Sequence, residues 1–242
     1  MPAKPTILFV PGAWHTEFHV RPVLPYLDKL GYEVKVLLLA NLGDHNGAET
    51  KPGLHDSVEK VFEAMRAEAE SGRDFVVQGH SAGGLVSAMA VNKFLPSATA
   101  EEKSRLKRVI FLAAFIRTSK HIISHWHHMD FKKGLSWPLR PEQVFYNDMS
   151  IEDSKPFCEA LLPITLTPRP DEIDSLWHEI PRTFIVASKD EALLPYKQRE
   201  EAEEQGFDIF ELDSGHCPFI SQPENFANVL NGIIQQGLEA KA

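Results

Sequence analysis

A short glycine-flanked serine motif constrains this chain more than any other feature. Residues 79–83 read Gly-His-Ser-Ala-Gly and join an apolar stretch at 75–77 to a helix-like stretch at 85–90. A serine in such a strand-to-helix turn is held in a sharp, strained bend that exposes its hydroxyl. Gly79 and Gly83 leave room where a Cβ would crowd the neighbouring strand or helix. The motif predicts a strand–turn–helix unit that presents Ser81 as a nucleophile.

Two further residues fit the needs of such a serine. A serine hydroxyl is a weak nucleophile until a base removes its proton, so Ser81 requires a histidine and an orienting carboxylate. Strand-like stretches at 183–187 and 207–212 are followed by Asp190 and His216, respectively. Ligands bind outside the carboxyl ends of strands in open parallel sheets. We therefore expect three loops to bring Ser81, Asp190 and His216 to one edge of a sheet.

These residues, in the order Ser, Asp, His, resemble the α/β-hydrolase fold superfamily. The chain is most similar to its short-cap branch, which includes plant methylesterases, hydroxynitrile lyases and small fungal and bacterial esterase-like hydrolases. The resemblance covers nearly the whole chain, with residues 188–195 similar to the acid loop and residues 215–219 similar to the histidine loop. It implies an α/β fold with a mostly parallel open sheet of about six strands, helices on both faces and an inserted cap.

The order of elements agrees with such an insertion. Strand-like and helix-like stretches alternate up to the strand at 109–114, and the alternation resumes at 183. The resemblance implies a hydrolase core at 1–116 and 179–242 and a cap at 117–178. Within the core we expect a helix around 20–30, closed by Gly31, and another that starts with a capping box at Asp56.

The beginning of the chain resembles another part of the same branch. Residues 7–15, Ile-Leu-Phe-Val-Pro-Gly-Ala-Trp-His, are similar to its first strand and oxyanion loop. The resemblance implies that the backbone N–H groups of Ala13 and Ala82 bind the oxyanion. Pro11 stands where the branch usually has a histidine, and this substitution leaves the N–H of Ala13 free.

Asp213 competes with Asp190 for the role of the acid. It lies three residues before His216, and we interpret it as a turn-forming residue at the end of a strand. Some relatives place the acid after the strand that follows the nucleophile helix, but no acidic residue lies near the end of the stretch at 109–114. We therefore assign the acid to Asp190.

Aromatic residues and histidines are the expected substrate contacts. A pocket lined by such side chains binds uncharged molecules by desolvation. The cap arginines each lie beside a proline, a turn or an element end, so we expect no carboxylate clamp from Arg117, Arg140 or Arg169. We therefore expect a neutral small or medium ester or lactone as substrate. The candidate contacts are Trp14, His15, His80, Trp126 and Trp137.

A histidine-rich segment of the predicted cap offers an alternative chemistry. Histidines surround Trp126 at positions 121, 125, 127 and 128, and the first two have a spacing that suits metal binding on a helix face. No carboxylate or cysteine lies at a partnering distance within this group, and a serine nucleophile requires no metal. We expect no metal site and no cofactor.

Composition limits the possible partners. The 242 residues are 43% hydrophobic and 24% charged, as in an ordinary globular domain, and the net charge of −9 disfavours nucleic acid. Two cysteines, Cys158 and Cys217, give no disulfide framework. The residues at the start of the sequence lead us to expect no signal sequence, and no apolar run approaches the ~20 residues that cross a bilayer. We expect a cytoplasmic monomer or homodimer with no membrane partner.

Other functions on the same scaffold remain alternatives to an ester hydrolase that acts through an acyl-enzyme. The hydroxynitrile lyases that this chain resembles have a lysine directly after the triad histidine, where this sequence has Cys217, which argues against cyanohydrin cleavage. A ligand receptor that retains the triad but hardly turns over stays open. A structural protein would leave the coincidence of the motifs unexplained. A dehalogenase would need a carboxylate at position 81.

Overall fold

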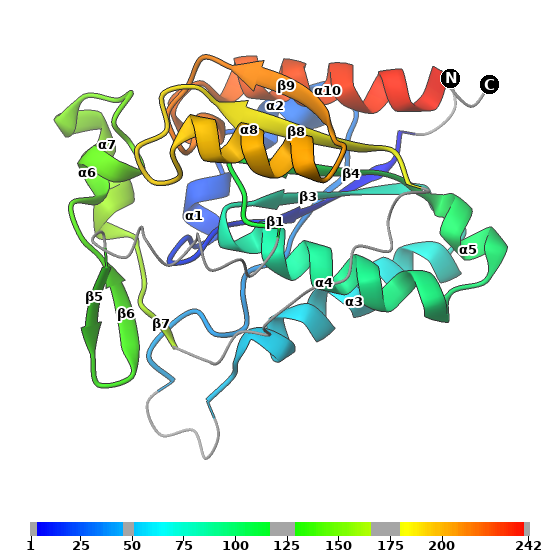
Figure 1. The fold of residues 1–242 in the computed structure, drawn as a ribbon, viewed down its shortest axis with the longest axis horizontal. Helices are drawn as coiled ribbons and strands as arrows, with labels where there is room; N and C mark the ends of the chain where they lie inside the picture. Colours follow the sequence, from blue (N-terminus) through cyan, green and yellow to red (C-terminus); the bar gives the residue numbers. More distant parts are fainter. Residues whose placement is uncertain (1–3, 46–50, 117–128, 166–179, 240–242) are drawn as a thin grey trace.

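The protein is built around one parallel sheet. The computed structural model describes residues 4–45, 51–116, 129–165 and 180–239. Six strands hydrogen-bond in the order β2-β1-β3-β4-β8-β9, and every neighbouring pair is parallel (Figure 1). The predicted parallel sheet of about six strands is confirmed. Its strands are β1 (Thr6–Val10), β2 (Val34–Val36), β3 (Phe75–His80), β4 (Leu106–Leu112), β8 (Arg182–Ala187) and β9 (Asp208–Leu212).

Helices cover both faces of this sheet, as predicted. A parallel sheet buried on both sides has nearly continuous apolar strands, and every residue of β1 and of β3 is buried. Figure 1 shows α2 and α10 above the sheet and α3 and α4 below it. The first face carries α1 (Glu17–Val20), α2 (Leu24–Lys29), α9 (Pro218–Ser221) and α10 (Pro223–Glu239). The second carries α3 (Leu54–Glu70), α4 (Ala82–Ser97) and α8 (Pro195–Glu204), while α5 (Ala100–Arg105) leads into β4.

Two helix predictions were wrong in their boundaries. The expected helix around 20–30 is divided into α1 and α2, because Pro22 has no N–H to continue the hydrogen bonds of α1. Gly31 follows α2 with a φ of 84°, as predicted for the end of a helix. The helix expected to start at Asp56 begins at Leu54 instead. Asp56 lies in its first turn and accepts a hydrogen bond of 2.7 Å from the backbone N–H of Gly53.

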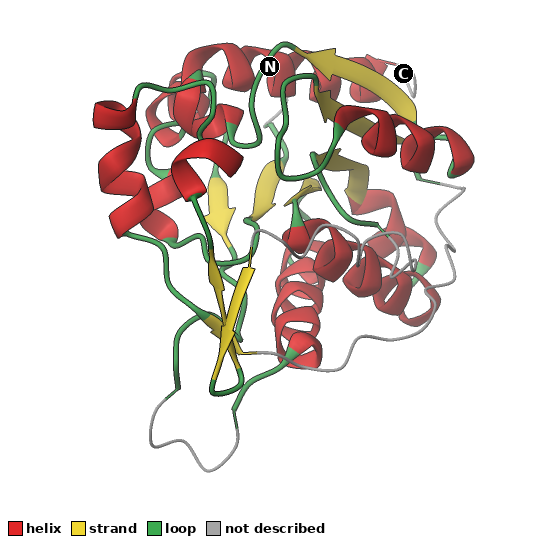
Figure 2. Cartoon of the chain, turned by 60° about the vertical axis from the view of Figure 1, so that its left-hand side comes forward, coloured by secondary structure: helices red, strands yellow, loops and turns green. Residues whose placement is uncertain are grey.

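The chain between β4 and β8 forms a second, smaller unit. Three short strands make an antiparallel sheet, β5 (Met129–Lys132), β6 (Leu135–Pro138) and β7 (Ile164–Thr165). Between β6 and β7 lie α6 (Pro141–Val144) and α7 (Ile151–Glu159), and Figure 2 shows this sheet set apart from the main one. The expected domain limits at 117 and 178 lie outside the described residues, so they stay a prediction.

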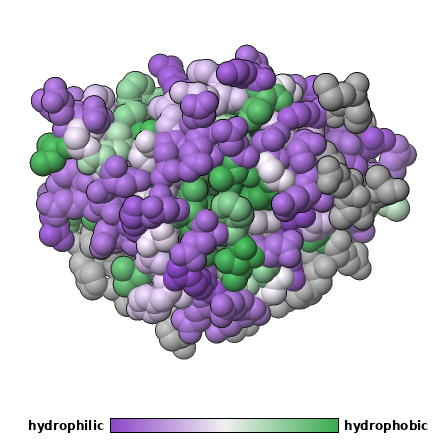
Figure 3. All heavy atoms as spheres, turned by 90° about the horizontal axis from the view of Figure 1, so that it is seen from above, coloured by the Kyte–Doolittle hydropathy of each residue, from purple (hydrophilic) through white to green (hydrophobic). Residues whose placement is uncertain are grey.

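The described helices were compared with the length and apolarity that a membrane span requires. None of these helices is both long and apolar enough to cross a bilayer. The face above α10 and β9 is mostly hydrophilic, with apolar side chains gathered near its middle (Figure 3). On β9, an edge strand, Ile209 and Phe210 are partly exposed.

Candidate active site

Ser81 has the strained backbone that the sequence motif predicts. It links the end of β3 to the start of α4 with a φ of 51° and a ψ of −125°. A non-glycine residue adopts a positive φ only when its surroundings hold it there. The N–H of Ser81 donates to the carbonyl of Leu112 at 3.2 Å, and its own carbonyl accepts from the N–H groups of Gly84 and Phe115 at 2.9 and 3.1 Å. Backbone bonds to three separate positions therefore fix the turn.

The two glycines of the motif allow close backbone contact. A Cβ on Gly79 would lie 2.8 Å from the Cα of Gly84. A Cβ on Gly83 would lie only 2.3 Å from the carbonyl oxygen of Val10, at the end of β1. The first turn of α4 thus packs directly against the chain that leaves β1. As a result Gly12, two residues further on, lies against Ser81, where an added Cβ would be 2.9 Å from the serine Cβ.

His216 and Asp190 are joined by a buried hydrogen bond. The Nδ1 atom of His216 lies 2.8 Å from Oδ2 of Asp190, and both residues are about 1% exposed. Asp190 follows β8 and His216 follows β9, which are neighbouring parallel strands. The structure therefore brings these two predicted residues together at the carboxyl edge of the sheet.

Several donors hold the Asp190 carboxylate in place. Its Oδ1 accepts from the N–H groups of Ala192 and Leu193 at 2.7 and 2.9 Å. Its Oδ2 also accepts from the Gln198 side chain at 2.8 Å, and Gln198 is itself anchored by the N–H of Ala187. Sequence reasoning missed Gln198, which has no motif and reaches Asp190 from α8. These donors fix both oxygens of the Asp190 side chain, with Oδ2 facing Nδ1 of His216.

Asp213 lies apart from this pair. It is exposed, and its carboxylate is 2.8 Å from the ammonium group of Lys189. The hydrogen bond from Lys189 lowers the pKa of Asp213. Its environment is that of a surface ion pair.

The hydroxyl of Ser81 is available for a new contact. Within the described residues its Oγ has no hydrogen-bond partner, and Ser81 is 7% exposed. The ring of the preceding residue, His80, packs against the His216 ring with 4.6 Å between centroids. The residue that precedes Ser81 in the chain therefore contacts His216, whereas the Oγ of Ser81 forms no hydrogen bond with that histidine. Catalytic hydrogen bonds are often loose without substrate, so the missing Ser81 bond does not exclude a catalytic contact.

Two backbone N–H groups near Ser81 form no hydrogen bonds among the described residues. They belong to Ala13 and Ala82. In contrast, the N–H group of the residue before each alanine forms a hydrogen bond. The N–H of Gly12 donates to Nδ1 of His80 at 3.2 Å, and the N–H of Ser81 donates to the carbonyl of Leu112. The predicted oxyanion donors are thus the unused N–H groups of two segments in contact.

His80 and His15 are placed differently from the expectation that they contact substrate. His80 is fully buried, and its Nε2 lies 3.0 Å from the carbonyl oxygen of His216. His15 is 2% exposed, with Nδ1 2.7 Å from the carbonyl of Ala13 and Nε2 3.3 Å from the Tyr146 hydroxyl. All four ring nitrogens thus have partners within the protein, and this placement does not support direct substrate binding by either histidine.

Trp14 links the loop after β1 to the insertion. It has a φ of 66°, which is unusual for a bulky residue. Its indole N–H donates to the carbonyl of Ser136 in β6 at 3.0 Å, and its own carbonyl accepts from Leu162 at 3.0 Å. Its ring stacks on Phe145 at 5.6 Å. Trp14 is 6% exposed, so it forms a buried joint between the two units.

The insertion contributes residues that the sequence motifs did not reveal. Phe145 lies over the His216 ring, with 5.5 Å between centroids. Asp148 accepts from the N–H of Gly215 at 2.8 Å and from the Ser221 hydroxyl at 2.7 Å. These contacts hold the segment after α6 against the histidine loop. No local signal marks them, because they join positions more than 60 residues apart.

The remaining residues predicted to contact substrate, and the possible metal ligands, lie on β6 or outside the described residues. Trp137 lies on β6 and is 40% exposed. Trp126 and the histidines at 121, 125, 127 and 128 lie outside the described residues. In the rest of the chain, as far as it is described, no group of three or more potential ligands is arranged to hold a metal ion.

Burial favours the neutral form of several side chains around the site. It lowers the pKa of His15 and of His80 well below the usual histidine value, and the neighbouring histidines add to the effect. Burial also lowers the pKa of His19. The Cys217 thiol is 3.4 Å from Nε2 of His15, and burial raises its pKa well above the usual value. Cys217 is therefore a neutral thiol.

Comparison with known proteins identifies the family. The model of the alpha/beta hydrolase family matches residues 7–229. The chain is 24% identical to the alpha/beta hydrolase nvfD of Aspergillus novofumigatus, over 98% of this chain and 99% of that protein. This chain therefore belongs to the alpha/beta hydrolase family, and this membership supports a hydrolase activity.

Solved structures share the fold at low identity. A pyrethroid hydrolase from Sphingobium faniae JZ-2 superposes with a TM-score of 0.77 at 20% identity, covering 97% of this chain and 99% of that one. Polyneuridine aldehyde esterase gives a TM-score of 0.75 at 16% identity, covering 95% and 99%. The architecture is thus shared from end to end.

The buried histidines predict a loss of stability in acid. His15, His19 and His80 have lowered pKa values when folded, whereas in the unfolded chain each binds a proton as the pH falls below about 6.5. Below that pH the unfolded state binds more protons, so the free energy of unfolding decreases by up to about 1.4 kcal/mol per pH unit for each histidine.

Urea unfolding at pH 7.5 and at pH 5.5 measures this difference. We expect lower stability at pH 5.5 and a weaker pH dependence in His19→Gln, which removes one of the three groups. Equal free energies of unfolding at the two pH values would contradict the neutral state of these histidines.

Proposed function

We propose that the protein is a serine hydrolase that cleaves neutral small or medium carboxylic esters or lactones through an acyl-enzyme on Ser81. The observation that carries this proposal is the buried 2.8 Å hydrogen bond between His216 and Asp190, at the edge of the sheet where the strained turn presents Ser81. A surface ion pair or a packed core histidine would not require such a turn beside it.

In the proposed mechanism, Nε2 of His216 accepts the proton of Ser81 as Oγ attacks the substrate carbonyl carbon. Asp190 keeps the imidazole in the tautomer with Nδ1 protonated and stabilises the imidazolium that forms. The proton then passes to the leaving alkoxide oxygen, which departs as the alcohol. Water, deprotonated by His216, attacks the acyl-enzyme. The bond between the acyl carbon and Oγ breaks, Oγ takes the proton back from His216, and the acid is released.

The oxyanion of each tetrahedral intermediate would be bound by the N–H groups of Ala13 and Ala82. Both donors are unused within the described residues and lie on segments that contact each other beside Ser81. Removing one such donor typically costs about 3–4 kcal/mol of transition-state stabilisation. Because the donors are backbone groups held by their neighbours, they need little rearrangement during the reaction.

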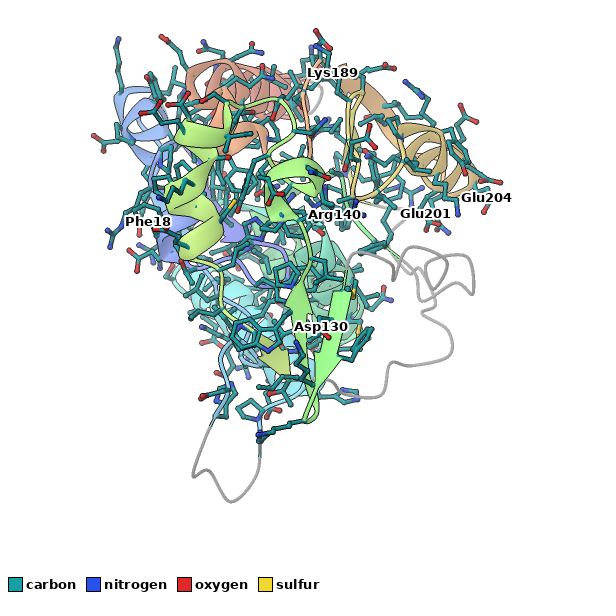
Figure 4. All side chains as sticks on the ribbon, turned by 90° about the vertical axis from the view of Figure 1, so that its left-hand side faces the viewer. Phe18, Asp130, Arg140, Lys189, Glu201 and Glu204 are labelled. Atoms are coloured by element: carbon teal, nitrogen blue, oxygen red, sulfur yellow. The ribbon has the colours of Figure 1, made fainter. Side chains whose placement is uncertain are left out.

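The charge distribution supports a neutral substrate. The buried charged side chains of the described residues are Glu68, Arg108 and Asp190. Glu68 pairs with Lys35, and Arg108 pairs with Asp208 at the start of β9, so only Asp190 belongs to the site. Of the cap arginines, Arg140 is the one described. It is exposed at the start of α6, on the face shown in Figure 4.

The insertion would act as the cap over this site. Phe145 lies over His216, and Trp14 is bonded to β6, so apolar side chains from both units meet beside the pair. The pyrethroid hydrolase and the polyneuridine aldehyde esterase that share the fold carry esterase or hydrolase names. Both observations favour ester cleavage within the hydrolase family.

A lyase on the same scaffold is the main competing function. The related lyases place a lysine after the catalytic histidine, and here Cys217 is a buried thiol with a raised pKa. A neutral thiol cannot supply the positive charge of a lysine. This difference favours hydrolysis over the lyase reaction. A ligand receptor with little turnover differs from a hydrolase in its catalytic rate, so an activity measurement distinguishes the two.

The first test of this function compares wild type with Ser81→Ala. We expect wild type to react with a fluorophosphonate and to hydrolyse neutral short-chain aryl esters with a higher kcat/KM than matched anionic or long-chain esters. Ser81→Ala should lose both reactions while its circular dichroism spectrum stays unchanged, because the nucleophile is removed from an intact fold.

Full hydrolysis by a folded Ser81→Ala protein would refute the nucleophile. A preference for anionic esters would refute the neutral substrate class but not the nucleophile. A wild type that binds esters without turnover would favour the receptor alternative.

The second test separates the two aspartates. Asp190→Asn should reduce kcat by roughly 10³–10⁴-fold, because the imidazole of His216 loses its orienting anion. Asp213→Asn should change kcat far less, because it weakens only exposed contacts with Lys189 and Ser188. Steady-state measurement of kcat in the two variants identifies which aspartate is the catalytic acid residue. A larger loss of kcat in Asp213→Asn than in Asp190→Asn would show that the acid is misassigned.

A further inference from the structure

One buried side chain bonds to two loops of the proposed active site at once. His80, within the nucleophile turn, accepts from the N–H of Gly12 in the oxyanion loop through Nδ1 at 3.2 Å. Its Nε2 faces the carbonyl oxygen of His216 at 3.0 Å. The imidazole therefore spans the space between the two loops, directly behind Ser81.

The two partners define the protonation state of this ring. The N–H of Gly12 can only donate, so Nδ1 must be unprotonated. The carbonyl of His216 can only accept, so Nε2 must carry the proton. The Cys217 sulfur is 4.0 Å from Nε2, which is longer than the bond to the carbonyl. Only the neutral tautomer with Nε2 protonated satisfies both bonds.

We propose that His80 is a positioning residue, which holds the oxyanion loop and the histidine loop at fixed positions on either side of Ser81. The role is indirect, since both ring nitrogens are occupied by backbone groups and neither is left for a substrate. This inference rests on the proposed serine hydrolase function, because it concerns the geometry of that same site.

The bond to Gly12 bears directly on the proposed oxyanion donor. Gly12 immediately precedes Ala13, and the carbonyl of Ala13 accepts from Nδ1 of His15 at 2.7 Å. The unused N–H of Ala13 thus lies between two anchored backbone groups. Loss of the His80 bond would free one of these anchors and allow that N–H to turn away from the oxyanion.

The bond to His216 bears on the proposed base. On one side, the N–H of Gly215 donates to Asp148 at 2.8 Å, and on the other the His216 carbonyl faces His80. The backbone around the imidazole is therefore anchored at the N–H of the preceding residue and at the carbonyl of His216 itself, and the ring is held by Asp190. A catalytic group displaced by about 1 Å can lower the rate about 100-fold.

The competing interpretation is that His80 is only a buried histidine with satisfied hydrogen bonds. His19 offers a matched control for this interpretation. It is also fully buried, and its ring nitrogens bond to Thr16 and to the carbonyl of Phe157. Its ring packs on that of His15 at 4.8 Å, but it forms no hydrogen bond to the oxyanion loop or the histidine loop within the described residues. A purely structural histidine at either position should affect stability and leave the rate and its pH dependence unchanged.

Two conservative variants separate the two bonds. In His80→Asn the side-chain oxygen lies near the position of Nδ1 and can accept from Gly12, but the donor to His216 is lost. In His80→Gln the amide N–H₂ reaches the position of Nε2 and can donate to His216, but the acceptor for Gly12 is lost. Both should lower kcat, by about 10–100-fold, with KM changed by less than about threefold.

The pH profile distinguishes the variants from each other. In His80→Asn the looser contact between His216 and Asp190 should move the acidic limb of the kcat/KM profile to lower pH, because the imidazolium loses stabilisation. In His80→Gln that limb should stay at the wild-type position. His19→Gln should retain the wild-type kcat and profile, whatever it loses in stability.

The tautomer can be measured without any substitution. In wild-type protein labelled with ¹⁵N-histidine, we expect the His80 ring to be neutral, with the proton on Nε2, and not to titrate between pH 5.5 and 8. The partners of His19 require the same tautomer, so His80→Gln and His19→Gln assign the two rings by the loss of their signals. A His80 ring protonated on Nδ1, or titrating in this range, would overturn the proposal.

The kinetic outcomes are also decisive. Wild-type kcat and pH profiles in both His80 variants would overturn the positioning role, as would an equal loss of kcat in His19→Gln. A wild type without esterase activity or fluorophosphonate labelling would instead refute the proposed function, and in that case the tautomer measurement alone decides whether His80 bridges the two loops.

Discussion

The close contact between the first turn of α4 and the end of β1 is the constraint on which the rest of the site depends. It exists because Gly83 has no side chain where the carbonyl of Val10 lies 2.3 Å from the position of a Cβ. The contact bends the chain at Ser81 into a positive φ and brings Gly12 against the serine. Strain at one residue and the meeting of two loops are thus results of the same packing.

Much of the fold and the approach of Asp190 to His216 could be predicted from sequence because the signals are local. Apolar stretches ending in loops mark parallel strands, and such strands gather their carboxyl ends at one edge. That rule suffices to expect Asp190 near His216, whose hydrogen bond the structure contains. The helix expected around 20–30 failed because Pro22 divides it, and that residue was visible in the sequence.

The supporting contacts could not be predicted, because they join residues far apart in sequence and depend on side-chain packing. Gln198 reaches Asp190 from α8, and Asp148 reaches Gly215 from the insertion. His80 was expected at the substrate on the basis of its place beside Ser81, but in the structure its ring is buried between the oxyanion loop and the histidine loop. Position in a motif determines where a backbone lies, whereas the direction of a side chain depends on its neighbours.

The central claim is that Ser81 carries a covalent acyl group during turnover. Rapid acid quenching of wild-type protein mixed with an activated aryl ester, followed by peptide mass spectrometry, measures this directly. We predict one acyl group per chain on the peptide that contains Ser81, and its accumulation in Asp190→Asn if deacylation becomes slow. Product formation with no acylated peptide under conditions where deacylation limits the rate, or an acyl group on Cys158 or Cys217 instead, would contradict the account.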